Sequence, residues 1–470
     1  MGKKDVVVYS EDYKKLVDAT ALKDKYYEID ERVEEICKEA FKGCDKLEEI
    51  VMPKKLKKID SEAFQGCTGL TKLTLPDSVM SIGKGAFCGC SGLTELTLPN
   101  SVKSIGDGAF ADCSGLTELT LSNSLVSIGG NAFRWCSELT ELTLPNSVTS
   151  IGYAAFGGCS GLEKITVDGG NKRYDSRDNC NSIIDTETNT LIVGCKNSVI
   201  PNGVTSIGDS AFGWCSELTE LVLPNSVTRI GDSAFEYCSG LTELTLPNSV
   251  ASIGDSAFEY CSGLTKLTLP NSITSIGYSA FYGCSGLTEL TLPNSVTSIG
   301  DSAFYVCRGL EKITVESGNS CYDSRDNCNS IIDKKTNTLI VGCKNSIIPN
   351  SVTSIGSGAF AYCSGLTELT LPNSVTSIGY AAFRGCSGLT ELTLPNSITS
   401  IGDYAFADCS GLSKITSLAE IPPVCDSEVF DGVNKTNCEL IVPEESITAY
   451  KQAKGWNEFS NIRGFVGEKK

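Results

Sequence analysis

The stretch CSGLTELTLPNSVASIGDSAFEY, residues Cys238 to Tyr260, contains the pattern that decides the fold. In it Leu244 and Leu246 alternate with polar residues, which is the two-residue period of a strand with one buried face. Pro247 then removes a backbone donor, so we expect the strand to end and the chain to turn there. The first part of the stretch is therefore predicted to be a short, half-buried strand.

The second part of the stretch predicts a bend and another buried segment. Val250 and Ile253 form a second apolar pair, and Gly254 permits the bend that follows. Ala257 and Phe258 are expected to point inward from one short helical turn. A unit of this size cannot bury its apolar side alone, so successive units must stack, with their strands about 4.8 Å apart in a parallel sheet.

The unit recurs along most of the 470-residue chain, and its cysteine returns every 23 residues in three runs. The runs are Cys44, Cys67, Cys90, Cys113, Cys136, Cys159; Cys215, Cys238, Cys261, Cys284, Cys307; and Cys363, Cys386, Cys409. Fourteen copies carry the Ala-Phe pair. Each gap between runs is 56 residues, one repeat plus 33, and the two gaps echo each other 148 residues apart, as Cys180 with Cys328 and Cys195 with Cys343. A fixed period of this length predicts a solenoid.

The repeated pattern L-x-x-L-x-L-P-x-x-V-x-x-I-G-x-x-A-F-x-x-C resembles the BspA-type leucine-rich repeats from about Tyr26 to Phe465. It departs from ordinary leucine-rich repeats because the cysteine precedes the strand. The resemblance implies an α/β, strand-dominated, right-handed leucine-rich-repeat solenoid with 23-residue coils. Its parallel sheet would lie on the concave face, with short helical turns opposite. The resemblance also implies a secreted or surface-displayed protein that adheres to host or matrix proteins.

The two ends and the two gaps depart from the repeat. Residues 1–25 are predicted to be an N-terminal cap, with a helix beginning at Ser10. Residues 26–416 form the predicted solenoid, in which inserts near 165–200 and 313–348 are expected to be hairpins. Residues 417–470 are predicted to be a C-terminal cap with a strand and then a helix capped by Ser446.

Composition excludes several functions. A net charge of -18 disfavours nucleic acid and anionic membrane surfaces. No histidine is present, which excludes His-based triads and His-containing zinc sites. No phosphate loop or nucleophile elbow occurs, so we expect a non-enzymatic chain with no catalytic residues and no cofactor.

The location is left open by the start of the chain. No apolar run is long enough to span a membrane, so no membrane insertion is expected. The opening MGKKDVVVYSEDYKK is not a signal peptide. Either the protein is cytoplasmic or a leader has been removed, and the resemblance favours an extracellular or cell-surface protein.

The metal and thiol interpretations are weaker than the structural ones. Asp175, Asp178, Asn179, Asn181 and Asp185 would offer oxygen ligands to calcium, but their spacing matches no EF-hand loop, and a solvated loop is favoured. The repeated cysteines are expected to be buried as small apolar residues. A disulfide between Cys425 and Cys438 is compatible with secretion, whereas many unpaired thiols suit a reducing compartment.

Two repeated surfaces are candidate binding sites. The first is the exposed side of the strands, whose columns are Glu95, Thr97, Glu118, Thr120, Glu141, Thr143, Glu220, Glu243, Thr245, Glu289, Thr291, Glu368, Thr370, Glu391 and Thr393. Lys72, Lys164, Lys266, Lys312 and Lys414 interrupt the acidic column. The alternative is that Thr suits strands and Glu keeps the sheet hydrated.

The second surface follows the Ala-Phe pair, where Trp135, Trp214, Tyr237, Tyr260 and Tyr362 share one position of the repeat. Trp and Tyr are frequent anchors of protein interfaces. The alternative, slightly favoured, is that the rings stack between coils. The leading hypothesis is an adhesin-like protein that binds a protein ligand of unknown identity, and the second is an intracellular protein-interaction scaffold.

Overall fold

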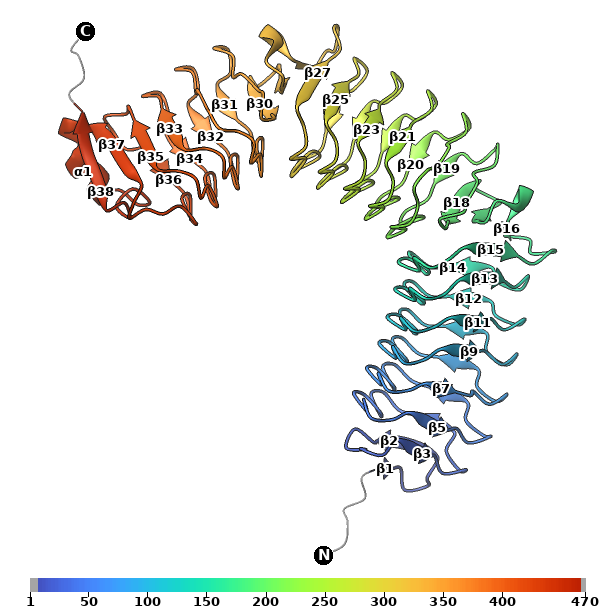
Figure 1. Ribbon diagram of the computed structural model, residues 1–470. Helices are drawn as coiled ribbons and strands as arrows, with labels where there is room; N and C mark the ends of the chain where they lie inside the picture. Colours follow the sequence, from blue (N-terminus) through green and yellow to red (C-terminus); the bar gives the residue numbers. More distant parts are fainter. Residues whose placement is uncertain (1–6, 466–470) are drawn as a thin grey trace, which may run out of the picture. The chain divides into compact units, whose positions relative to one another are not determined.

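The computed structural model describes residues 7–465 and divides into two compact units, Met1–Gly240 and Leu241–Lys470. Each unit is a strand-dominated solenoid built of 23-residue coils, and helices are few (Figure 1). Most regular coils contribute one strand to each of two rows. We call these the Leu row, after the buried leucine of its Glu-Leu-Thr motif, and the Ile row, after the Ser-Ile motif.

The Leu row carries the strands that the sequence predicted. In the first unit it consists of β3 (Tyr26–Glu28), β5 (Glu49–Val51), β7 (Lys72–Leu73), β9 (Glu95–Thr97), β11 (Glu118–Thr120), β13 (Glu141–Leu144) and β15 (Lys164–Val167). In the second unit it consists of β21 (Glu243–Thr245), β23 (Lys266–Thr268), β25 (Glu289–Leu292), β27 (Lys312–Val315), β33 (Glu391–Leu394), β35 (Lys414–Ser417), β37 (Glu439–Pro443) and β38 (Asn461–Phe465). Pairing is parallel throughout the row.

The Ile row is a second parallel ladder of short strands, mostly of two residues. The first unit contains β4 (Glu35–Ile36), β6 (Lys58–Ile59), β8 (Ser81–Ile82), β10 (Ser104–Ile105), β12 (Ser127–Ile128), β14 (Ser150–Ile151), β19 (Ser206–Ile207) and β20 (Arg229–Ile230). The second contains β22 (Ser252–Ile253), β24 (Ser275–Ile276), β26 (Ser298–Ile299), β31 (Ser354–Ile355), β32 (Ser377–Ile378), β34 (Ser400–Ile401) and β36 (Val424–Cys425). The sequence indicated a buried segment here, and the structure shows that it is a strand.

Identical residues of successive coils stack directly, because the strand register equals the repeat length. Glu118 pairs with Glu95 and Ile105 with Ile128, each 23 residues apart. In the core, neighbouring Phe rings from Phe41 to Phe156 lie 4.8 to 5.4 Å apart and within 8° of parallel. Such offset stacking adds to the free energy that burial of the rings contributes.

The repeated cysteines lie in this core and do more than fill space. Cys113 is fully buried, and its thiol donates to the carbonyl oxygen of Phe87, 26 residues earlier in the chain, at 3.3 Å. Cys90 makes the same bond to Phe64. Burial raises the pKa of the Cys113 thiol to about 12. These groups are therefore structural and unreactive at neutral pH.

The prediction of a short helical turn at each Ala-Phe pair is wrong. These residues form hydrogen-bonded turns with no helix, and the reason lies in where their amides point. Glu62, Phe64 and Gly66 donate to carbonyls of the next coil, at Lys84, Ala86 and Cys88. Amides committed between coils cannot make the i to i-4 bonds of a helix. Left-handed residues such as Glu62 (φ 58°) also interrupt helical geometry.

The ends of the chain differ from the prediction in two respects. The helix expected from Ser10 is absent: β1 (Val8–Tyr9) and β2 (Lys15–Asp18) pair antiparallel there, and Ser10 N–H donates to Lys15 across the turn. At the other end, η3 (Glu444–Ser446) leads into α1 (Ile447–Gln452). The Ser446 hydroxyl bonds to the carbonyl of Glu420 and does not cap α1. The boundaries of caps and solenoid stay a prediction.

Each insert is a small antiparallel meander. In the first unit β16 (Tyr174–Asp175), η1 (Arg177–Asn179), β17 (Ile183–Asp185) and β18 (Thr190–Val193) follow one another, and β18 pairs in parallel with β19 of the Ile row. In the second unit β28 (Tyr322–Asp323), η2 (Arg325–Asn327), β29 (Ile331–Asp333) and β30 (Thr338–Val341) repeat the arrangement beside β31. The meanders interrupt the Leu row after β15 and after β27 (Figure 1).

Candidate binding surface

The Glu and Thr columns named from the sequence all lie on the exposed side of the Leu row or at the equivalent place in coils that lack an assigned strand. In β9, for example, Glu95 and Thr97 are exposed while Leu96 between them is buried. The two-residue period of a strand produces this alternation. The surface is thus a regular array of carboxylates and hydroxyls that the buried leucines hold in place.

Lysines break the acidic column at defined places. Lys164 pairs with Glu141 at 3.2 Å, Lys312 with Glu289 at 3.5 Å and Lys414 with Glu391 at 3.2 Å. These exposed pairs contribute little to stability. Glu95 and Glu118, by contrast, are direct neighbours of like charge. The rows around β9 and β11 therefore offer negative charge to a partner.

The aromatic positions form inter-coil stacks. Trp135 meets Trp214 edge-on at 5.0 Å, and Trp214 stacks on Tyr237 at 5.8 Å. The guanidinium of Arg134 lies 4.5 Å from the centre of the Trp214 ring. In the second unit Tyr260 meets Tyr282 at 5.2 Å. Trp135 and Trp214 are half-buried, so contact between coils already accounts for much of their surface.

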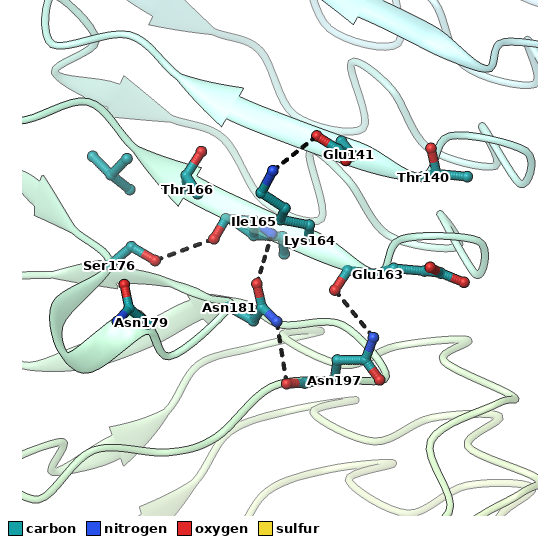
Figure 2. Close-up of a pocket in the computed structure, with 11 residues that line it drawn as sticks. Thr140, Glu141, Glu163, Lys164, Ile165, Thr166, Ser176, Asn179, Asn181 and Asn197 are labelled. Carbon is teal, nitrogen blue, oxygen red and sulfur yellow. Dashed lines mark hydrogen bonds and ion pairs between the residues drawn. The ribbon is translucent and has the colours of Figure 1, made fainter.

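Beside each insert lies a polar groove that the sequence reasoning missed. The first has a volume of about 680 Å³ and is shown in Figure 2. It is lined by Thr140, Glu141, Glu163, Lys164, Ile165, Thr166, Val167, Ser176, Asn179, Asn181 and Asn197. The second, of about 730 Å³, is lined by Thr288, Glu289, Glu311, Lys312, Ile313, Thr314, Ser324, Asn327, Asn329 and Asn345. Most of the two linings correspond residue by residue at a distance of 148 positions.

A short coil creates each groove. In the regular coil from Cys238, nine positions separate the cysteine from Pro247, but only six separate Cys195 from Pro201. The three missing residues belong to the strand of the Leu row, so this coil has no strand to place beside β15. The coil from Cys343 to Pro349 is shortened in the same way. The short spacing between the cysteine and the proline of these two coils was therefore the signal in the sequence that could have predicted the grooves.

Side chains of the insert occupy part of the empty edge of β15 (Figure 2). The Ile165 N–H donates to Asn181 Oδ1 at 3.2 Å, and Ser176 donates to the Ile165 carbonyl at 3.2 Å. Asn197 Nδ2 donates to the carbonyl of Glu163 at 3.3 Å. These bonds satisfy backbone groups that a neighbouring strand would otherwise pair.

Asp175 and Asp185 of the first insert pair with arginines. Arg177 pairs with Asp175 at 3.0 Å and Arg173 with Asp185 at 2.6 Å. Within residues 7–465 no group of three or more His, Cys, Asp or Glu side chains is placed to hold a metal ion. None of the 23 cysteines, all within that range, forms a disulfide, and Cys425 and Cys438 are buried and unpaired. In the same part of the chain, no helix has the length and apolar character to cross a bilayer.

Comparison with known proteins identifies the repeat. The profile of the BspA type leucine rich repeat region matches residues 22–114, 57–185, 205–332 and 330–449. A leucine-rich cell surface protein from Faecalibacterium prausnitzii A2-165 is 28% identical, with 80% of this chain and 86% of that chain covered and a TM-score of 0.54. No curated protein matches the chain.

Two further structures are similar at lower identity. A leucine-rich repeat protein from Bacteroides ovatus ATCC 8483 is 24% identical, over 98% of this chain and 97% of that one, with a TM-score of 0.41. The pneumococcal vaccine antigen PcpA is 19% identical over 98% of each chain, with a TM-score of 0.47. The family profile covers most of the chain and coincides with its 23-residue coils, and on this basis the chain belongs to the BspA-type leucine-rich repeat family.

Proposed function

We propose that this chain is a non-enzymatic, adhesin-like protein that binds host or matrix proteins through the exposed side of the Leu row. The observation that carries the proposal is the column of exposed Glu and Thr residues, repeated in most coils along a parallel sheet. Ordered elements lose little conformational entropy on binding, which favours affinity. That this face is concave and the coil right-handed stays a prediction.

The location of the protein is part of the same proposal. The Faecalibacterium prausnitzii protein, 28% identical over most of both chains, is described as a cell surface protein. We extend that location to this chain, as extracellular or surface-bound. The partner would carry basic or neutral residues where it meets Glu95 and Glu118, because these carboxylates are adjacent in register.

The test is binding of the full chain to immobilised extracellular-matrix and serum proteins at low and high salt. The double variant Glu95→Lys/Glu118→Lys should weaken binding of a genuine partner by about tenfold or more, since like charges would then face each other. High salt should weaken the wild-type complex for the same reason. The matched control is Glu31→Lys/Glu138→Lys, the same change of charge at exposed turn residues.

Saturable binding that only the strand-face variant weakens supports the proposal. Equal losses in both double variants would assign the effect to net charge and reject the strand face as the site. Absence of binding to every panel member would reject the adhesin role for those ligands.

A specific observation favours a second function, an intracellular scaffold. All 23 cysteines are unpaired, which suits a reducing compartment. Protease added to intact cells that make the protein discriminates the two locations. Digestion of the chain supports surface display, whereas protection until the cells are lysed supports the scaffold.

A further inference from the structure

The two short coils leave a strand-wide space in the Leu row of each unit. β15 pairs on one side with β13, and its other side faces the first groove. β27 likewise pairs with β25 and faces the second groove. The space exists because three residues are deleted from the coils that begin at Cys195 and Cys343. Each groove is therefore the place of a missing strand.

Backbone groups remain available along this edge. Ile165 directs its N–H to Asn181 on the groove side, so the two-residue period directs Val167 N–H and C=O to the same side. Among the hydrogen bonds of residues 7–465, none joins these Val167 groups to a side chain of the insert. Val315, the counterpart of Val167 at the end of β27, also has no hydrogen bond to a side chain of its insert among the described residues. The exposed Asn179 side chain also lines the first groove and has no hydrogen-bonded partner there.

The two copies show that one of the covering side chains is replaceable. In the first groove the Ser176 hydroxyl bonds to the Ile165 carbonyl at the strand edge. In the second groove the equivalent Ser324 bonds instead to the Ser330 carbonyl. The Ile313 carbonyl is thereby left open to the groove. The two equivalent serines thus differ in arrangement, and the backbone N–H of a peptide could replace the serine hydroxyl as the donor to the strand carbonyl.

Each short coil also carries an exposed aliphatic residue. Val199 is 68% exposed and Ile347, its counterpart 148 residues on, is 69% exposed. Counting back from the proline of the coil, both stand where a regular coil has the threonine of the Glu-Leu-Thr motif. Val222, at this position in the next coil, is 84% exposed. Aliphatic residues thus replace hydroxyls beside the first groove, and a solvated face alone does not require this.

We propose that each groove is a docking slot for an extended peptide segment of a partner protein, which adds a strand to the open edge of β15 or β27. This deepens the function proposed above and rests on it. The peptide backbone would pair with Val167 or Val315, and alternate side chains would reach the aliphatic residue of the short coil.

The lining distinguishes a peptide from other ligands. No aromatic ring lines either groove, so a sugar would find no stacking surface. Lys164 is paired with Glu141, and Lys196 bridges Glu163 and Glu217 at 2.8 and 2.7 Å, so no lysine is left for an anion. Amides, hydroxyls and an open strand edge are the groups that recognise a peptide backbone.

The experiment uses a displayed library of linear peptides of about 12 residues, long enough to span a strand. Peptides selected on the full chain are synthesised and titrated by calorimetry. We expect two sites per chain, and one site in Val199→Asp or in Ile347→Asp, with none in the double variant. Met80→Asp is the matched control, since Met80 is also an exposed apolar residue, 62% accessible, but belongs to neither short coil.

Backbone pairing is tested on the peptide, which avoids any variant that fails to fold. Two peptides are compared, one N-methylated at its odd-numbered residues and one at its even-numbered residues. One of them should bind about tenfold or more weakly and the other nearly unchanged, because only one of the two sets of N–H groups faces β15. Equal losses of affinity in the two methylated peptides would overturn strand addition.

Three other results overturn the proposal. In the first, no peptide is selected, and in the second, the selected peptides bind the Val199→Asp/Ile347→Asp variant as tightly as the wild type. In the third, the wild-type chain forms a dimer that the Val199→Asp/Ile347→Asp variant does not form. Binding to matrix proteins that Glu95→Lys/Glu118→Lys abolishes, without any slot-dependent peptide, would leave the strand-face function standing and reject the slots alone.

Discussion

Single residues decide how closely neighbouring coils approach in the turn that follows Ala-Phe. Trp135 reaches Trp214 across the intervening coil, whose residue at this position is Gly158. A Cβ at Gly158 would lie 2.9 Å from Cε3 of the Trp135 ring. Gly66 holds the same position in another coil, with φ +73° against +77° for Gly158, but no side chain lies near its Cβ direction. Substitution of Gly66 therefore adds backbone strain alone, whereas substitution of Gly158 adds backbone strain and a contact with the Trp135 ring.

We expect Gly66→Ala to lower the free energy of unfolding by about 1 kcal/mol, because alanine tolerates a left-handed conformation poorly. Gly158→Ala should cost about 1 to 2 kcal/mol more, since the Trp135 ring must also move. Urea unfolding of both variants measures the difference, and Trp fluorescence should change in Gly158→Ala alone. Equal costs in the two variants would show that the ring adapts freely.

The elements show which predictions depended on periodicity. The strand at Leu244 and the helix near Ser446 follow local patterns, and both are present. The helical turn at Ala257–Phe258 and the helix from Ser10 were wrong, because bonds to the next coil or strand override local preference. The grooves could not be predicted from a single repeat, because each forms between a regular and a shortened coil. The short spacing in sequence from Cys195 to Pro201 was nevertheless a signal for the first groove. The binding role of the columns stays a prediction.

The C-terminal segment closes the last coil of the second unit with one large side chain. Trp456 is fully buried, lies 5.1 Å from the Phe430 ring, and donates from Nε1 to the Pro423 carbonyl at 2.9 Å. Trp456→Ala should destabilise this end by about 3 to 5 kcal/mol. Hydrogen exchange should then speed up in β37 and β38 and stay slow in the first unit.

The matched control is Ile421→Ala in the same segment, because the Ile421 side chain is 83% exposed. Its exchange pattern should equal that of the wild type. A uniform loss of protection over the whole chain in Trp456→Ala would contradict the local effect and indicate that all coils unfold together.

At the scale of the whole molecule, small repeated terms add up because every coil carries the same buried group in the same place. Burial raises the pKa of Cys67, Cys113, Cys307 and Cys409 to about 12, from an ordinary value of 9.0. Tyr305 and Tyr450 shift in the same direction, also to about 12. The effect of one buried thiol is therefore multiplied along the chain.

The expected consequence is cooperative loss of stability in alkali. Between pH 9 and 12 the unfolded thiols release their protons while the folded ones keep them, so the unfolded state binds fewer protons and the free energy of unfolding falls as pH rises. Each buried thiol contributes up to about 1.4 kcal/mol per pH unit inside this window. Urea midpoints measured from pH 8 to about pH 11 under reducing conditions test this, with Cys67→Ala/Cys113→Ala as the comparison. The double variant should be less stable at pH 8 but lose stability less steeply, and an unchanged slope would show that the repeated thiols do not govern the alkaline transition.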